Sequence, residues 1–332
     1  MTHITLALPF ALPPAELAPD LVRALQAPAL AALLTRATCK TLPFDDNLRV
    51  LPHEVWLATK LGLSPSGHPV FGTAAMRGFE LETEGDSWFI INPAHVDIAR
   101  SHLSISDMRR LQLSEAHARA LFDTAKPLFD ELGKTLLYGD AQTWFMRAGD
   151  WKTMQTASPD AAVGMNLTDW LPLGAPATEF RKLQNEVQML WFEHPANVER
   201  ESAGLQAVNS FWPWAMAGAS EAFAFSATLS TIGAPGWLAA IARPFGHKPG
   251  DTTIVHAELC ESALSGDWAT WLGHMQRLEE TVFAPTLAAL MRSQHASVKL
   301  VFSHRNAHKE FTSTKMAQYA FWREPSLDLL LP

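Results

Sequence analysis

The chain has 332 residues, of which 48% are hydrophobic and 18% are charged, and its formal net charge is −8. This composition excludes a disordered or fibrous protein and indicates a large buried core, in one domain with an insertion or in two domains. The acidic balance, with no block of Lys or Arg, argues against broad binding of nucleic acids or anionic membranes, and it leaves room for local basic pockets.

Neither a disulfide framework nor a membrane anchor is expected. Cys39 and Cys260 are the two cysteines, which is too few for such a framework and typical of a reducing compartment. The apolar runs are shorter than a bilayer span, and the apolar N-terminus is broken by Pro9 and Pro13 and has neither a basic start nor a cleavage site. We therefore expect a cytoplasmic protein.

The first two thirds of the chain predict alternating strands and helices. Apolar and turn residues indicate strands over 4–10, 87–91 (ending at Asn92 and Pro93) and 144–147, and helices over 27–37 and over 115–132, the latter capped by Ser114. Apolar positions that recur every three or four residues predict one further helix, from Thr178 to about Glu201.

The last hundred residues continue the alternation. They predict strands over 252–257 and 298–303, a long helix over 268–291 and a short terminal element over 319–323. Strands that alternate with helices in this way form a mostly parallel sheet flanked by helices, so the expected fold class is α/β.

The most specific motif of the chain occupies residues 194–214. It consists of His194, Pro195, Ala196, Asn197, Arg200, Gly204 and the run from Asn209 to Trp214. This order resembles the His-Pro-Val-Asn, Arg, Gly, Ala-Asn and Trp-x-Trp-Gly segment of the archaeal-type cofactor-independent phosphoglycerate mutases, a branch of the alkaline phosphatase superfamily. The resemblance implies an alkaline-phosphatase-like core, over residues 1–60 and 240–332, and an inserted α+β subdomain over 61–239 that carries the motif.

The family uses two metal ions and a nucleophilic Ser or Thr, and the matching positions of this chain hold other residues. The strand that ends in a metal-binding Asp corresponds to residues 4–10, where Leu8 and Pro9 stand. The Asp-His metal pair corresponds to Ser303 and His304. Glu258 stands where the family has a Lys. Cys260, Glu261 and Leu264 lie near the positions of a family Asp and a family His. Asp45, Asp46 and Asn47 stand where the family has its nucleophile.

These replacements bear on catalysis because two-metal phosphoryl transfer needs several ligands that converge on ions roughly 4 Å apart. One remaining His cannot hold two ions. We therefore expect a phosphoglycerate-mutase-like protein of a bacterial cytoplasm that has largely lost catalysis, has no metal cofactor, and serves as a ligand-binding or regulatory protein.

Two alternatives remain open at this point. The first is an active metal-dependent phosphomutase or phosphatase that acts on a small phosphorylated acid with Mn or Zn, with ligands drawn from Asp45, Asp46, Glu258, Glu261, Asp267 and His304. The second is a structural, partner-binding subunit, which would show a large exposed apolar patch and no anion-binding pocket.

We expect the protein to bind either a small anionic ligand or a protein partner. Arg200, His194 and Asn209 would converge on the anion, because a guanidinium suits a phosphate or a carboxylate. Asn197, Trp212 and Trp214 complete the candidate ligand-binding set. Each of these residues also has a structural interpretation: His194 and Asn197 can end a helix, Arg200 can pair with Glu186 or Glu201, and Trp212 and Trp214 can pack in the core.

Overall fold

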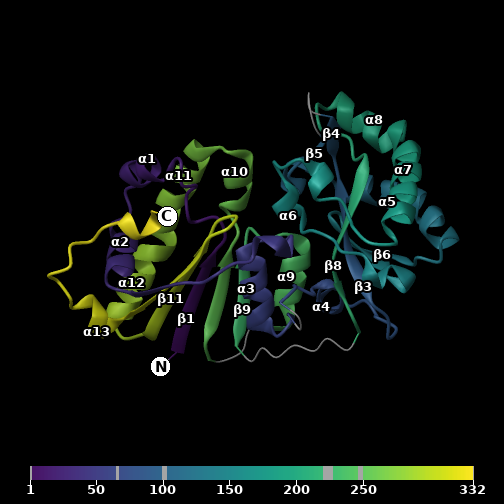
Figure 1. Ribbon diagram of the computed structural model, residues 1–332. Coiled ribbons are helices and arrows are strands. Elements are labelled where there is room, and N and C mark those ends of the chain that lie inside the picture. Colours follow the sequence, from purple (N-terminus) through teal and green to yellow (C-terminus); the bar gives the residue numbers. More distant parts are fainter. Residues whose placement is uncertain (1, 65–66, 99–102, 220–226, 246–249, 332) are drawn as a thin grey trace.

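Two lobes, each built on its own β-sheet, lie side by side in the structure (Figure 1). The structure is a computed structural model that describes residues 2–64, 67–98, 103–219, 227–245 and 250–331. Within the described part of the chain, no helix has the length and apolar character needed to span a membrane.

The larger lobe contains a six-stranded sheet made from both ends of the chain. Strands β1 (Thr2–Leu8), β10 (Thr252–His256), β11 (His295–Ser303) and β9 (Thr228–Ile232) are parallel, while β12 (His308–Thr314) and β2 (Thr38–Thr41) add an antiparallel edge. The order across the sheet is β2-β12-β11-β1-β10-β9. Central parallel strands are apolar on both faces because helices cover both, and Leu6 and Leu300 on one face and Ala7 and Val301 on the other are accordingly buried. The expected α/β class is confirmed.

Helices cover both faces of this sheet (Figure 1). On one side lie α1 (Ala18–Ala24), α2 (Pro28–Thr35), α11 (Trp268–Leu278) and α12 (Ala284–Met291), and on the side of the other lobe lie α3 (Pro52–Leu61) and α9 (Gly236–Ala242). Shorter helices are α10 (Cys260–Ser265), α13 (Lys315–Gln318) and the single turns Asp46–Leu48, Arg243–Phe245 and Asp328–Leu330.

The smaller lobe contains a four-stranded antiparallel sheet in the order β6-β7-β3-β8. Its strands are β3 (Trp88–Ala94), β6 (Leu136–Asp140), β7 (Thr143–Arg147) and β8 (Ser210–Ala217), and β4 (Val96–Ile98) pairs with β5 (Leu103–Ile105). A second core, with Phe89, Trp144 and Trp191 among its residues, lies under the helices of this lobe. These helices are α5 (Glu115–Glu131), α6 (Pro159–Ala162), α7 (Ala177–Phe192), α8 (Pro195–Ser202) and the turns Met108–Leu111, Gly149–Thr153 and Leu167–Asp169.

Three predicted boundaries are wrong. Strand β3 continues through Asn92 and Pro93 to Ala94, because these residues pair with β8. The helix predicted from Thr178 to Glu201 is two helices, since Pro195 has no N–H to donate and the extended His194 before it caps α8. Residues 319–323 form turns, and the short terminal helix is α13, which ends at Gln318.

The helix predicted over residues 268–291 is confirmed as one helical segment with an irregular middle. A π-helical turn, Glu279–Phe283, separates α11 from α12. The carboxylate of Glu279 accepts hydrogen bonds from the N–H groups of Ala29 (2.7 Å) and Leu30 (3.0 Å) at the start of α2. A free N-terminal turn of a helix favours an acidic partner in this way.

A short buried helix, α4 (Gly72–Gly78), joins the two lobes. A Cβ atom on Gly72 would collide with the backbone carbonyl of Trp88 in β3, and one on Gly78 would collide with the backbone of Ala240 in α9. Backbone therefore packs directly against backbone at both ends of α4. The large sheet also includes β9, which lies within the predicted insert 61–239, next to β10.

Candidate functional site

The carboxyl ends of the parallel strands are the usual place for an active site in an open α/β sheet. Strands β1, β10 and β11 end at Leu8, His256 and Ser303. The next residue after Pro9 is Phe10, whose φ of 60° turns the chain sharply away from the sheet. Leu8, Phe10 and Ala257 are buried apolar residues. These three strands end in one apolar and two polar side chains, and none of the three carries a carboxylate.

A group of charged residues from the smaller lobe covers this edge. Arg109 forms hydrogen bonds through both terminal nitrogens with the carboxylate of Asp160, and Nη1 also donates to Asp107 Oδ1 at 2.8 Å. The side chains of Arg109, Asp107 and Asp160 are only 19%, 2% and 18% exposed. Arg109 and Asp160 line a cavity of about 30 Å³ together with Pro9, Leu57, Trp237 and Cys260. We call Asp107, Arg109 and Asp160 the buried ion cluster.

Burial decides the protonation of the groups around the buried ion cluster. Burial disfavours the charge of Arg109, but Asp160 and Asp107 hold its pKa well above the ordinary value. Burial raises the pKa of the Cys260 thiol to about 12, so the thiol is protonated at neutral pH. Burial, and then the charge of Asp160, raise the pKa of Glu54 to about 8. Burial lowers the pKa of His53 to about 4, so this ring is neutral.

The residues at the edge of the sheet do not fit a two-metal centre. Leu8 and Pro9 offer no side-chain ligand, and the Ser303 hydroxyl lies 3.3 Å from Nδ1 of His53. In the described part of the chain, no three residues of the types His, Cys, Asp and Glu gather closely enough to hold an ion. Two ions need several such ligands each, and the Asp160 carboxylate, which lines the cavity at this edge, is already bonded to Arg109.

The candidate metal ligands lie apart and mostly have local structural partners. Asp45 accepts from the N–H of Asn47 at 2.9 Å, and Asp267 caps α11 through Thr270. His304 packs edge-on against Phe10, and burial together with the charge of Arg305 lowers its pKa to about 4. Glu258 bonds to His256 at 3.1 Å, Glu261 faces the pocket described below, and the side chain of Asp46 lies outside the described residues.

The polar residues of the 194–214 motif bond mainly to backbone. Asn197 donates to the carbonyls of Trp191 and Val208 and accepts from the N–H of Val208, each at 2.8 Å. Asn209 pairs with both backbone groups of Val96, at 2.8 and 2.9 Å. Their amides are therefore engaged in holding loops in place.

His194 and Arg200 have similar local roles. Nδ1 of His194 accepts from the N–H of Ala196 at the start of α8, and Nε2 bonds to Thr124 at 3.0 Å. Arg200 is fully buried and donates to the carbonyls of Gln206 (2.9 Å) and Leu111. Among the described residues, its Nη1 has no hydrogen-bond partner. In the part of the chain that the structure describes, neither residue lines the cavity at the sheet edge or the pocket described below, and anion binding by them stays a prediction.

The two tryptophans of the motif are buried and face the larger lobe. The indole N–H of Trp212 donates to the carbonyl of Ala157 at 2.8 Å, and that of Trp214 donates to Asn92 Oδ1 at 2.7 Å. Trp214 also packs edge-on against Trp237 of α9, with 5.1 Å between ring centroids. Trp214 therefore helps to hold the lobes together, and ligand binding by the two tryptophans stays a prediction.

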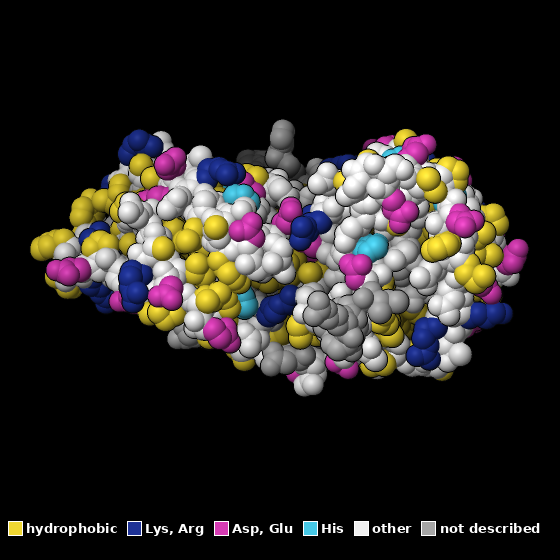
Figure 2. All heavy atoms as spheres, turned by 90° about the horizontal axis from the view of Figure 1, so that it is seen from above, with side chains coloured by type: hydrophobic (Ala, Val, Ile, Leu, Met, Phe, Trp, Pro, Cys, Tyr) yellow, Lys and Arg dark blue, Asp and Glu magenta, His cyan; other side chains and the backbone are white. Residues whose placement is uncertain are grey.

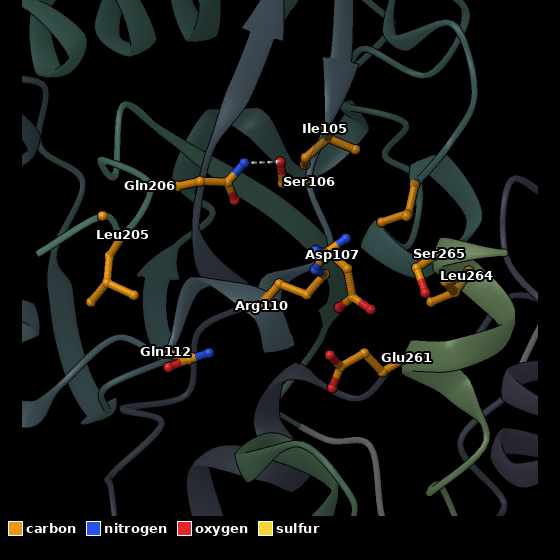
Figure 3. A pocket seen from close by; sticks show the side chains of 12 residues that line it. Ile105, Ser106, Asp107, Arg110, Gln112, Leu205, Gln206, Glu261, Leu264 and Ser265 are labelled. Carbon is orange, nitrogen blue, oxygen red and sulfur yellow. Dashed lines mark hydrogen bonds between the residues drawn. The ribbon is translucent and has the colours of Figure 1, made fainter. Parts of the chain in front are cut away.

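A pocket of about 580 Å³ opens between the lobes beside the buried ion cluster. One wall comes from α10 of the larger lobe, and the other from residues 105–112 and 204–206 of the smaller lobe (Figure 3). Arg200 holds both parts of the second wall, because it binds the carbonyls of Gln206 and Leu111. The 194–214 motif therefore supports the pocket from behind. We call this space the interlobe pocket.

The interlobe pocket carries charged side chains of both signs. In Figure 3 the carboxylates of Asp107 and Glu261 lie toward each other across the pocket, and Arg110 lies beside Asp107. Seen from above, side chains of both charges lie close together in the middle of the molecule, between the lobes (Figure 2). Ser106, Gln112, Gln206 and Ser265 add polar groups, and Ile105, Val163, Leu205 and Leu264 add apolar ones.

The buried ion cluster and Arg110 are not recognisable as site residues in the sequence. Asp107, Arg109 and Arg110 stand in a short stretch with no family motif, and Asp160 lies fifty residues away in the chain. The local sequence signal is a pair of adjacent arginines shortly after an Asp. This pattern is as typical of a solvent-exposed turn as it is of a buried charged site. The two possibilities differ in whether the charged side chains are buried, and the sequence does not reveal their burial.

No family model matches the sequence, and no curated protein matches it. Two solved structures are similar over most of the chain. The cofactor-independent phosphoglycerate mutase from Thermoplasma acidophilum DSM 1728 shares 14% identity at a TM-score of 0.45, covering 98% of this chain and 93% of that one. The PH0037 protein from Pyrococcus horikoshii shares 10% identity at a TM-score of 0.49, covering 94% and 87%. Both similarities concern the fold alone.

Proposed function

We propose that this protein keeps a phosphoglycerate-mutase-like fold without two-metal phosphoryl transfer, and that it binds a small charged molecule in the interlobe pocket as a regulatory protein. The observation that carries the proposal is the filling of the sheet edge. Leu8, Pro9 and the buried ion cluster occupy the place where the family resemblance would put metal ligands.

The buried ion cluster prevents its carboxylates from binding metal. Its carboxylates already bond to a guanidinium in a poorly solvated place, and removing one partner of such a pair costs roughly 3–5 kcal/mol. A metal ion that recruited Asp160 would have to displace Arg109. Cys260, the remaining soft ligand at this edge, holds its proton at neutral pH, and the protonated thiol is neither a good ligand nor a nucleophile.

The interlobe pocket supports the binding part of the proposal. Pockets that hold small molecules are often found between domains, and they are commonly about 300–1,000 Å³ in volume. The interlobe pocket is about 580 Å³ and takes residues from both lobes. Its occupant would touch α10 and the 204–206 loop together, which makes its binding sensitive to the state of either lobe.

The first experiment combines elemental analysis of the purified protein with mutase and phosphatase assays in added Mn, Zn and Mg. We expect less than one tenth of an equivalent of metal and no turnover above a blank, as measured beside an active mutase. Near-stoichiometric metal with turnover would contradict the proposal, because it would require a ligand set that the residues at the sheet edge do not provide.

A protein partner is the second candidate, and an exposed apolar surface favours it. Met316, Tyr319, Phe321 and Trp322, all in one short segment at and beyond α13, are 79%, 53%, 81% and 72% exposed. Sedimentation velocity of the wild type and of the double variant Phe321→Ser, Trp322→Ser tests whether this surface drives self-association. A concentration-dependent increase in sedimentation that the double variant abolishes would support it, and equal behaviour of both proteins would count against it.

A further inference from the structure

The acidic side of the interlobe pocket has unused hydrogen-bonding capacity. Asp107 accepts from Arg109 through Oδ1 alone, and among the described residues its buried Oδ2 has no partner. The exposed carboxylate of Glu261 lies across the pocket and forms no hydrogen bond or ion pair with any described residue. An unpartnered buried carboxylate oxygen is costly. A ligand that donates hydrogen bonds would satisfy it.

The basic side of the pocket is also unpaired. Arg110 is exposed, and no hydrogen bond or ion pair joins its guanidinium to another described side chain. It lies in the turn Met108–Leu111, whose N-cap is Asp107, so the backbone fixes its position on the wall next to Asp107. A guanidinium binds a carboxylate or phosphate through two parallel hydrogen bonds. The pocket therefore offers a site for an anion as well.

Both charges in one pocket restrict the ligand more than either does alone. A simple anion would place its charge near Glu261 and Asp107, and a simple amine would place its charge near Arg110. Like charges that approach in a partly closed site cost free energy. A ligand that carries an ammonium group at one end and an anionic group at the other avoids both penalties.

The apolar lining gives the ligand its third part. Ile105, Val163, Leu205 and Leu264 border the same space as the charged groups. Burying an apolar side chain there gains roughly 25 cal/mol per Å² of surface removed from water. Leu264 and Glu261 lie one turn apart on α10, so an apolar group and an ammonium can meet the same helix.

From these three features we propose that the interlobe pocket binds a small zwitterion with an apolar portion, such as an α-amino acid. Its ammonium lies between Glu261 and Asp107 Oδ2, its carboxylate binds Arg110, and its apolar side chain packs against Leu205 and Leu264. This inference rests on the proposed function, because it names the class of ligand for the same pocket.

The test uses three molecules that differ by one charge at a time. Phenylalanine carries both charges, phenethylamine lacks the carboxylate, and 3-phenylpropionate lacks the amine. We expect calorimetric titration of the full chain to give phenylalanine a Kd about tenfold below that of either analogue, a difference that corresponds to roughly 1.4 kcal/mol. Equal affinity for all three molecules would overturn the zwitterion proposal.

Two variants assign the two ends of the ligand. Glu261→Gln should raise the Kd of phenylalanine and phenethylamine about tenfold and leave that of 3-phenylpropionate unchanged or lower. Arg110→Gln should weaken phenylalanine and 3-phenylpropionate and spare phenethylamine. Glu280→Gln and Arg23→Gln, both at exposed positions outside the pocket, serve as matched controls. If the controls change the affinities as much as the pocket variants do, the assignment of the pocket is wrong.

A fourth probe separates this inference from the proposed function. 3-Phosphoglycerate is a small anion without an amine. If it binds more tightly than phenylalanine and Glu261→Gln strengthens that binding, the pocket binds ligands but the zwitterion class is refuted. If none of the four molecules binds and none changes the chemical shifts of the Leu205 and Leu264 methyl groups at millimolar concentration, both the zwitterion inference and the binding part of the proposed function fail.

Discussion

Arg109 and Arg110 are neighbours in the chain and carry the same charge, yet they lie in opposite surroundings. Arg109 turns inward and bonds to Asp107 and Asp160 at the edge of the large sheet. Arg110 turns to the interlobe pocket and is unpaired among the described residues. Two adjacent arginines can therefore serve different purposes: Arg109 contributes to stability, and Arg110 is available for binding. The buried, paired charges stabilise the part of the smaller lobe that covers the sheet edge, and the exposed, unpaired charge of Arg110 remains for a ligand.

Removing the buried guanidinium should have the largest effect. Arg109→Met leaves Asp107 and Asp160 buried without a cation, and we expect the free energy of unfolding to fall by roughly 3–5 kcal/mol. Urea denaturation followed by Trp fluorescence measures it. The control is Arg23→Met, which breaks an exposed ion pair with Asp20, both side chains being about 80% exposed, and which should change stability by less than about 0.5 kcal/mol. Similar losses in both variants would contradict the assigned role of the buried ion cluster.

A substitution of Asn197 tests whether an uncharged buried side chain also contributes to stability rather than to ligand binding. Asn197→Ala removes three hydrogen bonds to backbone groups that would stay buried, so we expect a loss of roughly 2–4 kcal/mol. Asn185→Ala, at an exposed position on α7, is the matched control and should be nearly neutral. If Asn197→Ala leaves stability intact but abolishes ligand binding, Asn197 is a ligand-binding residue as the family resemblance implies.

Glu54 is intermediate, because it is buried but has no cation of its own. Its carboxylate accepts from the N–H of Leu51 at 2.7 Å, and its pKa of about 8 lies above its ordinary value of 4.5. The folded state therefore holds a proton that the unfolded state releases, and stability falls as pH rises from about 4.5 to 8. Glu54→Gln keeps the acceptor and removes the ionisation.

We expect Glu54→Gln to equal the wild type near pH 4.5 and to exceed it by roughly 1–3 kcal/mol at pH 8. Urea titrations at pH 5, 6.5 and 8 measure the difference, with the exposed Glu131→Gln as the control. Curves that stay parallel at all three pH values would show that Glu54 ionises equally in both states.

Arg110→Gln should have the smallest effect on stability. The guanidinium is exposed and unpaired among the described residues, so its loss should change the free energy of unfolding by less than about 0.5 kcal/mol. The same urea titration used for Arg109→Met measures it, at pH 7. A loss of 2 kcal/mol or more would mean that Arg110 is a structural residue and would remove the contrast between the two arginines.

Much of the fold could be predicted from the sequence, because the spacing of apolar residues and the positions of turn-forming residues both reflect local structure. The α5 helix and its Ser114 cap, and the strands β1, β7, β10 and β11, follow from patterns of apolar residues. The helix predicted to Glu201 runs too far because its apolar positions end at Trp191, and Pro195 favours an extended conformation of the residue before it. The spacing of apolar residues indicates which side of a helix is buried, but it does not indicate whether the helix is continuous.

Less of the candidate site could be predicted, for two physical reasons. The 194–214 motif marks the right loop, yet whether an Asn or Arg side chain bonds to backbone or to a ligand depends on the folded path of Leu111, Gln206 and Val208. The buried ion cluster forms between residues 107–109 and 160, and nothing in the sequence around Asp160 indicates a charged partner fifty residues earlier.

The glycines at the two ends of α4 have a consequence for how a ligand would be sensed. Because backbone meets backbone at Gly72 and at Gly78, the lobes have little freedom to swing about α4. The walls of the interlobe pocket are then preorganised, and an entering molecule spends little of its binding free energy on closing them. Such a receptor gives no large change of shape to report occupancy. A downstream partner would have to read the altered charge and contour at the mouth of the pocket itself.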